Sequence, residues 1–142
     1  MRSTSSTGQM VELRVASEFA KHGITVYNPV SEHDSHDLLV EVSGEYYKIQ
    51  CKHGRYDEDE DVVFVSLRST RRNGTDKHYT ADEVDYYASY ASEIDRVFLI
   101  PFEEVGTDKV RLRVSYKDVR PCNKDKINWA DQYSFDTRVF EL

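Results

Sequence analysis

The sequence predicts an α/β fold in which helices bracket a central set of strands. An apolar stripe at helical spacing lies near the N-terminus, short apolar runs follow through the middle, and helix-start signals recur near Thr80. The chain has 142 residues, of which 39% are hydrophobic and 12% aromatic. It is therefore long enough to bury a core, and we expect a single domain over residues 1–142.

The first predicted element is a helix from a cap at Ser6 or Thr7 to about His22, with Gly23 as its stop. Glu12 falls on the apolar face of this helix rather than on the solvent face. A carboxylate in that position either lies at the positive end of the helix or reaches a cation.

The remaining elements follow from apolar runs and turn signals. Strands are expected over residues 24–30, 62–67, 97–100 and 110–114, and a hairpin over residues 37–52. Glu83 stands in capping-box position after Thr80, so residues 80–91 are expected to form a helix. Near the C-terminus we expect a short helix over residues 126–133 and a last strand over residues 137–142.

The hairpin is the most informative segment because polar residues recur on one face of its second strand. A two-residue turn at Gly44-Glu45 places three pairs on that face: Glu41 with Lys48, Leu39 with Gln50, and Asp37 with Lys52. Asp37, Gln50 and Lys52 then meet at the open end of the hairpin, where they can share a hard cation such as Mg²⁺ and its water. The alternative is that the two charged pairs are exposed cross-strand ion pairs.

This order of residues resembles the PD-(D/E)XK nuclease superfamily, and within it the group I intron-associated endonuclease family. The resemblance lies in Glu12 on a helix, Asp37 opening a hairpin strand, and Gln50-Cys51-Lys52 on the next strand, a variant with Gln in place of the usual acid. It extends over residues 8–52, 79–105 and 126–133.

The resemblance implies a restriction-endonuclease-like core, with a central mixed β-sheet flanked by helices. It also implies metal-dependent hydrolysis of DNA phosphodiester bonds, of the homing or site-specific type, with Mg²⁺ or Mn²⁺. Cutting two strands needs two sites, so a homodimer or homotetramer is expected. By position, Asp37 would be the principal metal ligand, Gln50 a ligand through its amide oxygen, Glu12 a carboxylate beside the metal, and Lys52 the residue that positions or activates water.

The charge pattern limits where DNA can bind. The net charge is −7 and the sequence pI about 5.2, which argues against a surface that is basic all round. Much of the acid lies in residues 57–61, whereas residues 68–77 are basic, so a polyanion is expected on one side only. The candidate DNA contacts are Arg55, Arg68, Arg71, Arg72, Lys77 and His78. A solvated basic loop is the alternative for each of them.

Two other functions stay open. A Holliday-junction resolvase of the same superfamily would cut by DNA shape. Such enzymes carry a basic N-terminal arm, whereas Arg2 is the only basic residue before Glu12 in this sequence. A nuclease-fold protein that binds nucleic acid or a protein partner without cutting is favoured by the charge of −7 and by Gln50.

Other features of the sequence are less specific. His33, His36, Cys51 and His53 suggest zinc, but strand parity places Cys51 opposite Gln50, in the core. No apolar run approaches the roughly 20 residues of a membrane span. The polar N-terminus lacks the apolar core of a signal peptide, and the two cysteines are far apart, so a cytoplasmic location is expected.

Overall fold

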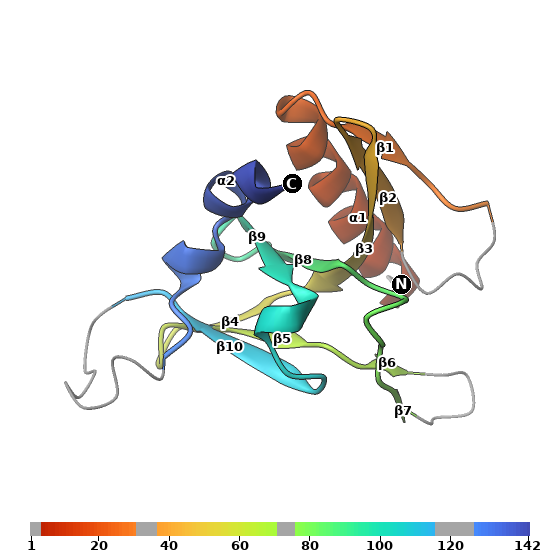
Figure 1. The fold of residues 1–142 in the computed structure, drawn as a ribbon. Coiled ribbons are helices and arrows are strands. Elements are labelled where there is room, and N and C mark those ends of the chain that lie inside the picture. Colours follow the sequence, from red (N-terminus) through yellow and green to blue (C-terminus); the bar gives the residue numbers. More distant parts are fainter. Residues whose placement is uncertain (1–3, 31–36, 71–75, 116–126) are drawn as a thin grey trace.

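The computed structural model describes residues 4–30, 37–70, 76–115 and 127–142 (Figure 1). Its main sheet has five strands in the order β1-β2-β3-β8-β9. Their bounds are β1 (Thr25–Tyr27), β2 (Leu38–Val42), β3 (Glu45–His53), β8 (Tyr86–Ala91) and β9 (Arg96–Pro101). Strands β3 and β8 are parallel and the other neighbours are antiparallel, so the sheet is mixed.

A second, antiparallel sheet and a few helices complete the described fold. The second sheet has the order β10-β5-β4, with β4 (Arg55–Asp57), β5 (Val62–Ser66) and β10 (Lys109–Arg113). Strands β6 (Ser69–Thr70) and β7 (Asp76–Lys77) pair with each other. The helices are α1 (Thr4–Lys21), α2 (Phe135–Arg138), and the 3₁₀ turns η1 (Phe102–Glu104), η3 (Ala130–Tyr133) and η4 (Val139–Glu141).

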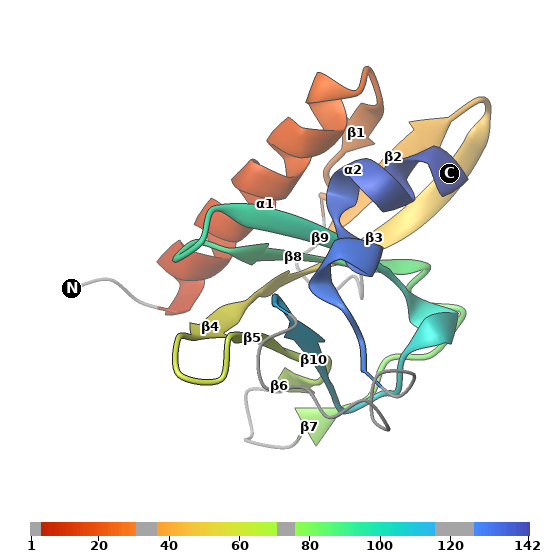
Figure 2. The ribbon, with the colours of Figure 1, turned by 90° about the vertical axis from the view of Figure 1, so that its left-hand side faces the viewer.

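The main sheet lies between two different layers (Figure 2). Helices α1 and α2 cover one face, where Phe19 packs with Ile49 and Leu99 in one buried cluster. The second sheet covers the other face, where Val63 and Tyr87 belong to a second buried cluster. The predicted α/β class and central mixed sheet are confirmed, and the layer opposite the helices is a sheet. No helix in the described part of the chain is long and apolar enough to cross a membrane.

The first helix is confirmed, and the apolar stripe is what fixes it. Val11, Val15 and Phe19 are buried at helical spacing against the main sheet. Gly23 follows the helix with φ +71°, a left-handed conformation that ends helices and that glycine adopts without strain.

The helix predicted over residues 80–91 is wrong. The capping contacts exist, since Glu83 accepts hydrogen bonds from the backbone and hydroxyl of Thr80 at 3.1 and 3.2 Å, but they close one turn. Asp85 then donates its N–H to the Lys48 carbonyl at 2.9 Å, and the chain enters the main sheet as β8. Most of β8 is buried because helices cover one face and a sheet the other, so it lacks the alternation that identifies a half-exposed strand.

The last strand predicted over residues 137–142 is also wrong. These residues continue from α2 into η4, while the short helix expected before them is present as η3. Phe135 and Val139 are both buried four residues apart, which is helical spacing, and Phe135 packs edge-on against Phe19 with ring centroids 4.8 Å apart. Packing against α1 therefore decides the conformation of this segment.

The hairpin turn lies one residue earlier than predicted. Ser43 and Gly44 form it, with φ values of +52° and +82°, as a type I′ turn requires, and Val42 pairs with Glu45. The register is shifted by two residues from the expected one, so each side chain keeps its predicted face but meets a different partner.

Candidate active site

Asp37 lies immediately before β2 and is the centre of the candidate site. Its N–H donates to the Ile49 carbonyl at 2.9 Å, which places it opposite Gln50, one step beyond the paired residues of β2 and β3. Its Oδ2 accepts hydrogen bonds from Gln50 Nε2 and from the Cys51 N–H, both at 2.9 Å. The predicted pairing of Asp37 with Lys52 is therefore corrected to a pairing with Gln50.

Lys52 lies two residues after Gln50 on β3 and on the same face of the sheet, and its ammonium is bound by a residue that follows β5. Its Nζ donates to the Arg68 carbonyl at 2.6 Å and lies 5.3 Å from the centre of the Tyr79 ring. Burial lowers the pKa of Lys52, whereas the negative charge of Asp37 acts in the opposite direction. The ammonium therefore interacts with the Arg68 carbonyl, just after β5, and with the charge of the Asp37 carboxylate.

Glu12 approaches the same carboxylate from α1. Burial raises the pKa of Glu12, and the charge of Asp37 raises it further. Two carboxylates that repel each other in a half-buried position are an arrangement that a cation relieves. Asp37 therefore interacts with Gln50 by a hydrogen bond and with Glu12 and Lys52 by charge, and the catalytic role of these four residues stays a prediction.

Tyr79 is a neighbour of the site that sequence reasoning missed. It is buried beside the Lys52 ammonium, and its ring meets that of Tyr87 edge-on with centroids 6.2 Å apart. Burial raises the pKa of its phenol, and the charge of Asp37 adds to this effect. Tyr79 stands in a polar, basic stretch of sequence whose pattern gives no indication of a buried aromatic.

The other predicted pair of the hairpin is not formed. Glu41 pairs with Tyr46 in the register and accepts a hydrogen bond from the Tyr27 hydroxyl at 2.8 Å. Lys48 donates from Nζ to the Asp82 carbonyl at 2.5 Å. The two-residue shift in register is the reason, since it separates Glu41 from Lys48.

The predicted DNA contacts are only partly within the described residues. Arg55 is exposed on β4, His78 is exposed after β7, and the Arg68 guanidinium pairs with Asp108 at the end of β5. Arg71 and Arg72 lie outside the described residues, as does the side chain of Lys77. Their roles stay predictions.

The zinc alternative gains no support from the described residues. Cys51 is buried in the cluster under α1, where burial raises the pKa of its thiol well above the usual value. His53 is exposed, with a ring nitrogen 3.4 Å from the Ser92 hydroxyl. His33 and His36 lie outside the described part of the chain.

A different group of possible metal ligands lies at the end of α1. Ligand atoms of Glu18, His22 and Asp136 lie within 4.8 Å of one another. Glu18 already forms ion pairs with Arg14 and, at 3.5 Å, with Lys21. Six residues separate Glu18 from Glu12, about 9 Å along a helix, so this group is distinct from the site around Asp37.

The fold is similar to that of a solved homing endonuclease. A chain described as a bacterial homing endonuclease, I-Ssp6803I, matches with a TM-score of 0.77 at 21% identity, covering 98% of this chain and 93% of that one. MepB matches with a TM-score of 0.45 at 15% identity, covering 86% of this chain and 93% of its own. The search of the curated proteins found no match.

The fold of this chain is restriction-endonuclease-like. The family model of the PD-(D/E)XK endonucleases matches residues 2–136, and the chain belongs to that family. The matched range contains Glu12, Asp37, Gln50 and Lys52.

Proposed function

We propose that this nuclease is a divalent-metal-dependent DNA endonuclease of the site-specific type, with its active centre at Asp37. One observation carries the proposal: a single carboxylate is hydrogen-bonded to Gln50 and electrostatically coupled to both Glu12 and Lys52. Helix α1, the residue before β2, and strand β3 supply these residues. An ordinary exposed ion pair has no need of this convergence.

The donor set fits Mg²⁺ or Mn²⁺. Asp37 and Glu12 supply carboxylate oxygens, and Gln50 supplies an amide oxygen, because its Nε2 is the end that donates to Asp37. Hard cations take such oxygen ligands together with water and substrate phosphate. When bound, the cation supplies Lewis-acid stabilisation of the phosphoryl oxygens.

Lys52 is the residue placed to act on the water and the developing charge. Its ammonium has three N–H donors, and the Arg68 carbonyl accepts from one of them. The remaining donors can orient the attacking water and stabilise negative charge on the phosphate. Hydrolysis then adds water across one P–O bond, leaving a phosphate on one DNA end and a hydroxyl on the other.

Site-specific cutting of both strands and assembly into a homodimer or homotetramer belong to the same proposal. The fold similarity to a homing endonuclease and the family membership favour this type of activity. Two active centres in one assembly would cut two strands of a duplex.

The test compares substrates and variants. Plasmid DNA and four-way junctions are incubated with wild type, Asp37→Ala and Lys52→Ala, in Mg²⁺ or in EDTA. Lys21→Ala, at an exposed position on α1, serves as the matched control for loss of a lysine.

Each outcome separates one reading from the others. Plasmid cutting that needs Mg²⁺ and is lost in both variants, but not in the control, supports the proposal. Cutting of junctions alone identifies a resolvase instead. If wild type binds DNA but cuts neither junctions nor a plasmid library with randomised inserts, the chain is a non-cleaving member of the fold, and the proposal is wrong.

A further inference from the structure

The outer face of the second sheet carries a row of cations that the sequence analysis did not single out. Lys109, Arg111 and Arg113 occupy alternate positions of β10, while Val110 and Leu112 between them are buried against the core. Alternate residues of a strand point to the same face, about 6.5–7 Å apart. The three cations therefore form a stripe along one edge strand.

An aromatic residue, Phe64, lies beside the middle of this stripe. Phe64 on β5 pairs with Arg111 on one side and with Arg55 of β4 on the other. Both guanidinium carbons lie over its ring, Arg55 at 5.1 Å and Arg111 at 5.0 Å from the centroid. Stacking orders the guanidinium planes while their edge N–H groups stay available to hydrogen-bond an anion.

The stripe begins next to the candidate active site. Strand β5 continues through Leu67, whose N–H donates to the Asp108 carbonyl at 2.9 Å, to Arg68, whose carbonyl holds Lys52. Asp108 immediately precedes Lys109. Lys109, the first cation of the stripe, therefore follows Asp108, whose carbonyl is bonded to Leu67. Leu67 directly precedes Arg68, whose carbonyl accepts the hydrogen bond from Lys52.

We propose that this face, formed by Arg55, Phe64, Lys109, Arg111 and Arg113, binds the DNA phosphate backbone beyond the cleavage position. Charge complementarity argues for this occupant, since the outer face gathers four cations on a chain whose net charge is −7. This proposal takes from the proposed function only the identity of the partner, which is DNA. It does not depend on cleavage.

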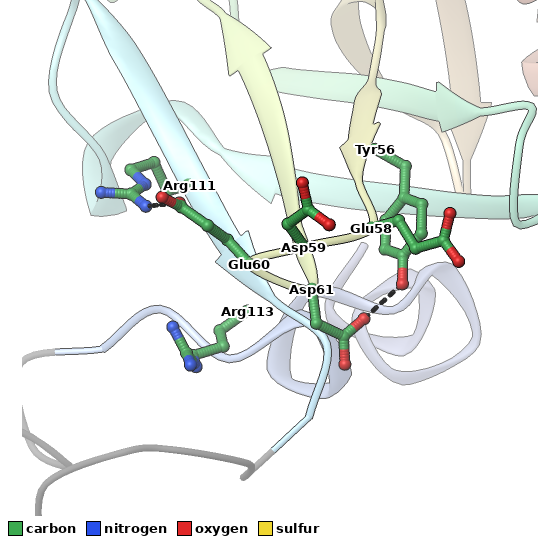
Figure 3. Close-up of a pocket in the computed structure, with 7 residues that line it drawn as sticks. All are labelled: Tyr56, Glu58, Asp59, Glu60, Asp61, Arg111 and Arg113. Atoms are coloured by element: carbon green, nitrogen blue, oxygen red, sulfur yellow. Dashed lines mark hydrogen bonds and ion pairs between the residues drawn. The ribbon is translucent and has the colours of Figure 1, made fainter.

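An acidic loop competes for the same cations in the protein alone. The acidic turn between β4 and β5 (Glu58, Asp59, Glu60 and Asp61) lines a cavity of about 520 Å³ together with Arg111 and Arg113, and Figure 3 shows Glu60 reaching Arg111. The Arg111 guanidinium binds Glu60 Oε2 at 2.5 Å. DNA must displace this ion pair, so Glu60 weakens binding, and its removal strengthens it.

The experiment measures binding to a fluorescent 30-bp duplex of arbitrary sequence by anisotropy, in EDTA, between 50 and 200 mM salt. Wild type is compared with Lys109→Gln, Arg111→Gln, Glu60→Gln and, on α1, the matched control Lys21→Gln. We expect the slope of log affinity against log salt to fall by about one for each lost phosphate contact. We expect Glu60→Gln to raise the affinity by up to about fivefold, the range of one exposed ion pair.

Misfolding does not produce the gain expected for Glu60→Gln, so this variant keeps the proposal testable. Unchanged slopes in Lys109→Gln and Arg111→Gln overturn it, as does a wild type that fails to bind. Light scattering on the same samples detects the remaining occupant: if Arg111→Gln dissociates an oligomer, the face joins two copies instead. Binding through the stripe without any cleavage refutes the proposed nuclease reaction but not this surface.

Discussion

The side-chain amide of Gln50 donates a hydrogen bond of 2.9 Å to the carboxylate of Asp37, and this bond joins β3 to the start of β2. Gln50 is also nearly buried, with 8% of its surface exposed. The family motif has an acidic residue in its place. The amide therefore satisfies Asp37 in the protein alone, and under the proposed function its oxygen is the atom that would face a bound metal.

Gln50→Glu should make folding depend on metal. A carboxylate in contact with Asp37 and near Glu12 adds like-charge repulsion and removes a donor, at a cost of about 1–3 kcal/mol in EDTA. Mg²⁺ should restore most of that stability. Urea denaturation with and without Mg²⁺ measures both effects, with exposed Gln132→Glu as the control. Equal stability of Gln50→Glu and wild type in EDTA would contradict this role.

Glu12 should lower stability at neutral pH in the absence of metal. Its pKa is raised on folding, so folding favours its protonated form, and the penalty grows as the pH rises above the unfolded pKa and is complete above the folded pKa. Glu12→Gln should therefore match wild type below pH 4.5, the unfolded value, and be more stable near pH 7. Solvent screening of this half-exposed group keeps the gain below about 1 kcal/mol. Denaturation from pH 4 to 7.5 in EDTA tests the sign, and a constant difference across that range would exclude it.

Tyr79 should act on the reaction through the Lys52 ammonium. Tyr79→Phe keeps the ring under the charge, whereas Tyr79→Leu removes it, so we expect near wild-type cleavage for the first and roughly a tenfold loss for the second. DNA affinity in Ca²⁺ should be the same for both. The ring-current shift of the Lys52 ε-protons in NMR spectra should persist in Tyr79→Phe and vanish in Tyr79→Leu. If Tyr79→Leu cuts at the wild-type rate, the ring has no such role.

Gly54 should be required where the chain passes from the main sheet to the second sheet. A Cβ there would lie 2.8 Å from Ser89 Oγ and 2.9 Å from Val63 Cγ1, both buried. Gly54→Ala should cost about 1–3 kcal/mol through overpacking. Gly106→Ala is the matched control, because open space surrounds that position. Thermal unfolding of the two variants gives the comparison, and similar melting temperatures would refute the close approach.

Much of the site was predictable because it depends on local periodicity. Helical spacing places Glu12 on the packed face of α1, and strand parity keeps Gln50 and Lys52 together even when the register shifts by two residues. The cross-strand partners of the hairpin residues were not predictable, because they depend on the left-handed backbone of Ser43 in the turn. Strand parity determines on which face of the sheet a side chain lies, whereas the geometry of the turn determines which residues pair across the hairpin.

The errors in the fold have a related physical cause. Strand β8 is mostly buried by layers on both faces, so it lacks the alternation that identifies a strand, and the capping signal at Thr80 and Glu83 predicted a helix instead. Tyr79 is buried by tertiary packing that no local pattern encodes. The stripe on β10 did have a sequence signal, the alternation in residues 109–113, and its importance emerges once β5 and β4 complete the sheet.

The most direct test of the central claim is a titration with Mn²⁺, followed by electron paramagnetic resonance, of wild type, Asp37→Asn and Glu18→Gln. Glu18 belongs to the other group of possible ligands and is the matched control. We expect wild type and Glu18→Gln to bind Mn²⁺ with the same affinity, and Asp37→Asn to bind at least about 100-fold more weakly. Undiminished binding by Asp37→Asn, or its loss in Glu18→Gln, would contradict a metal centre at Asp37.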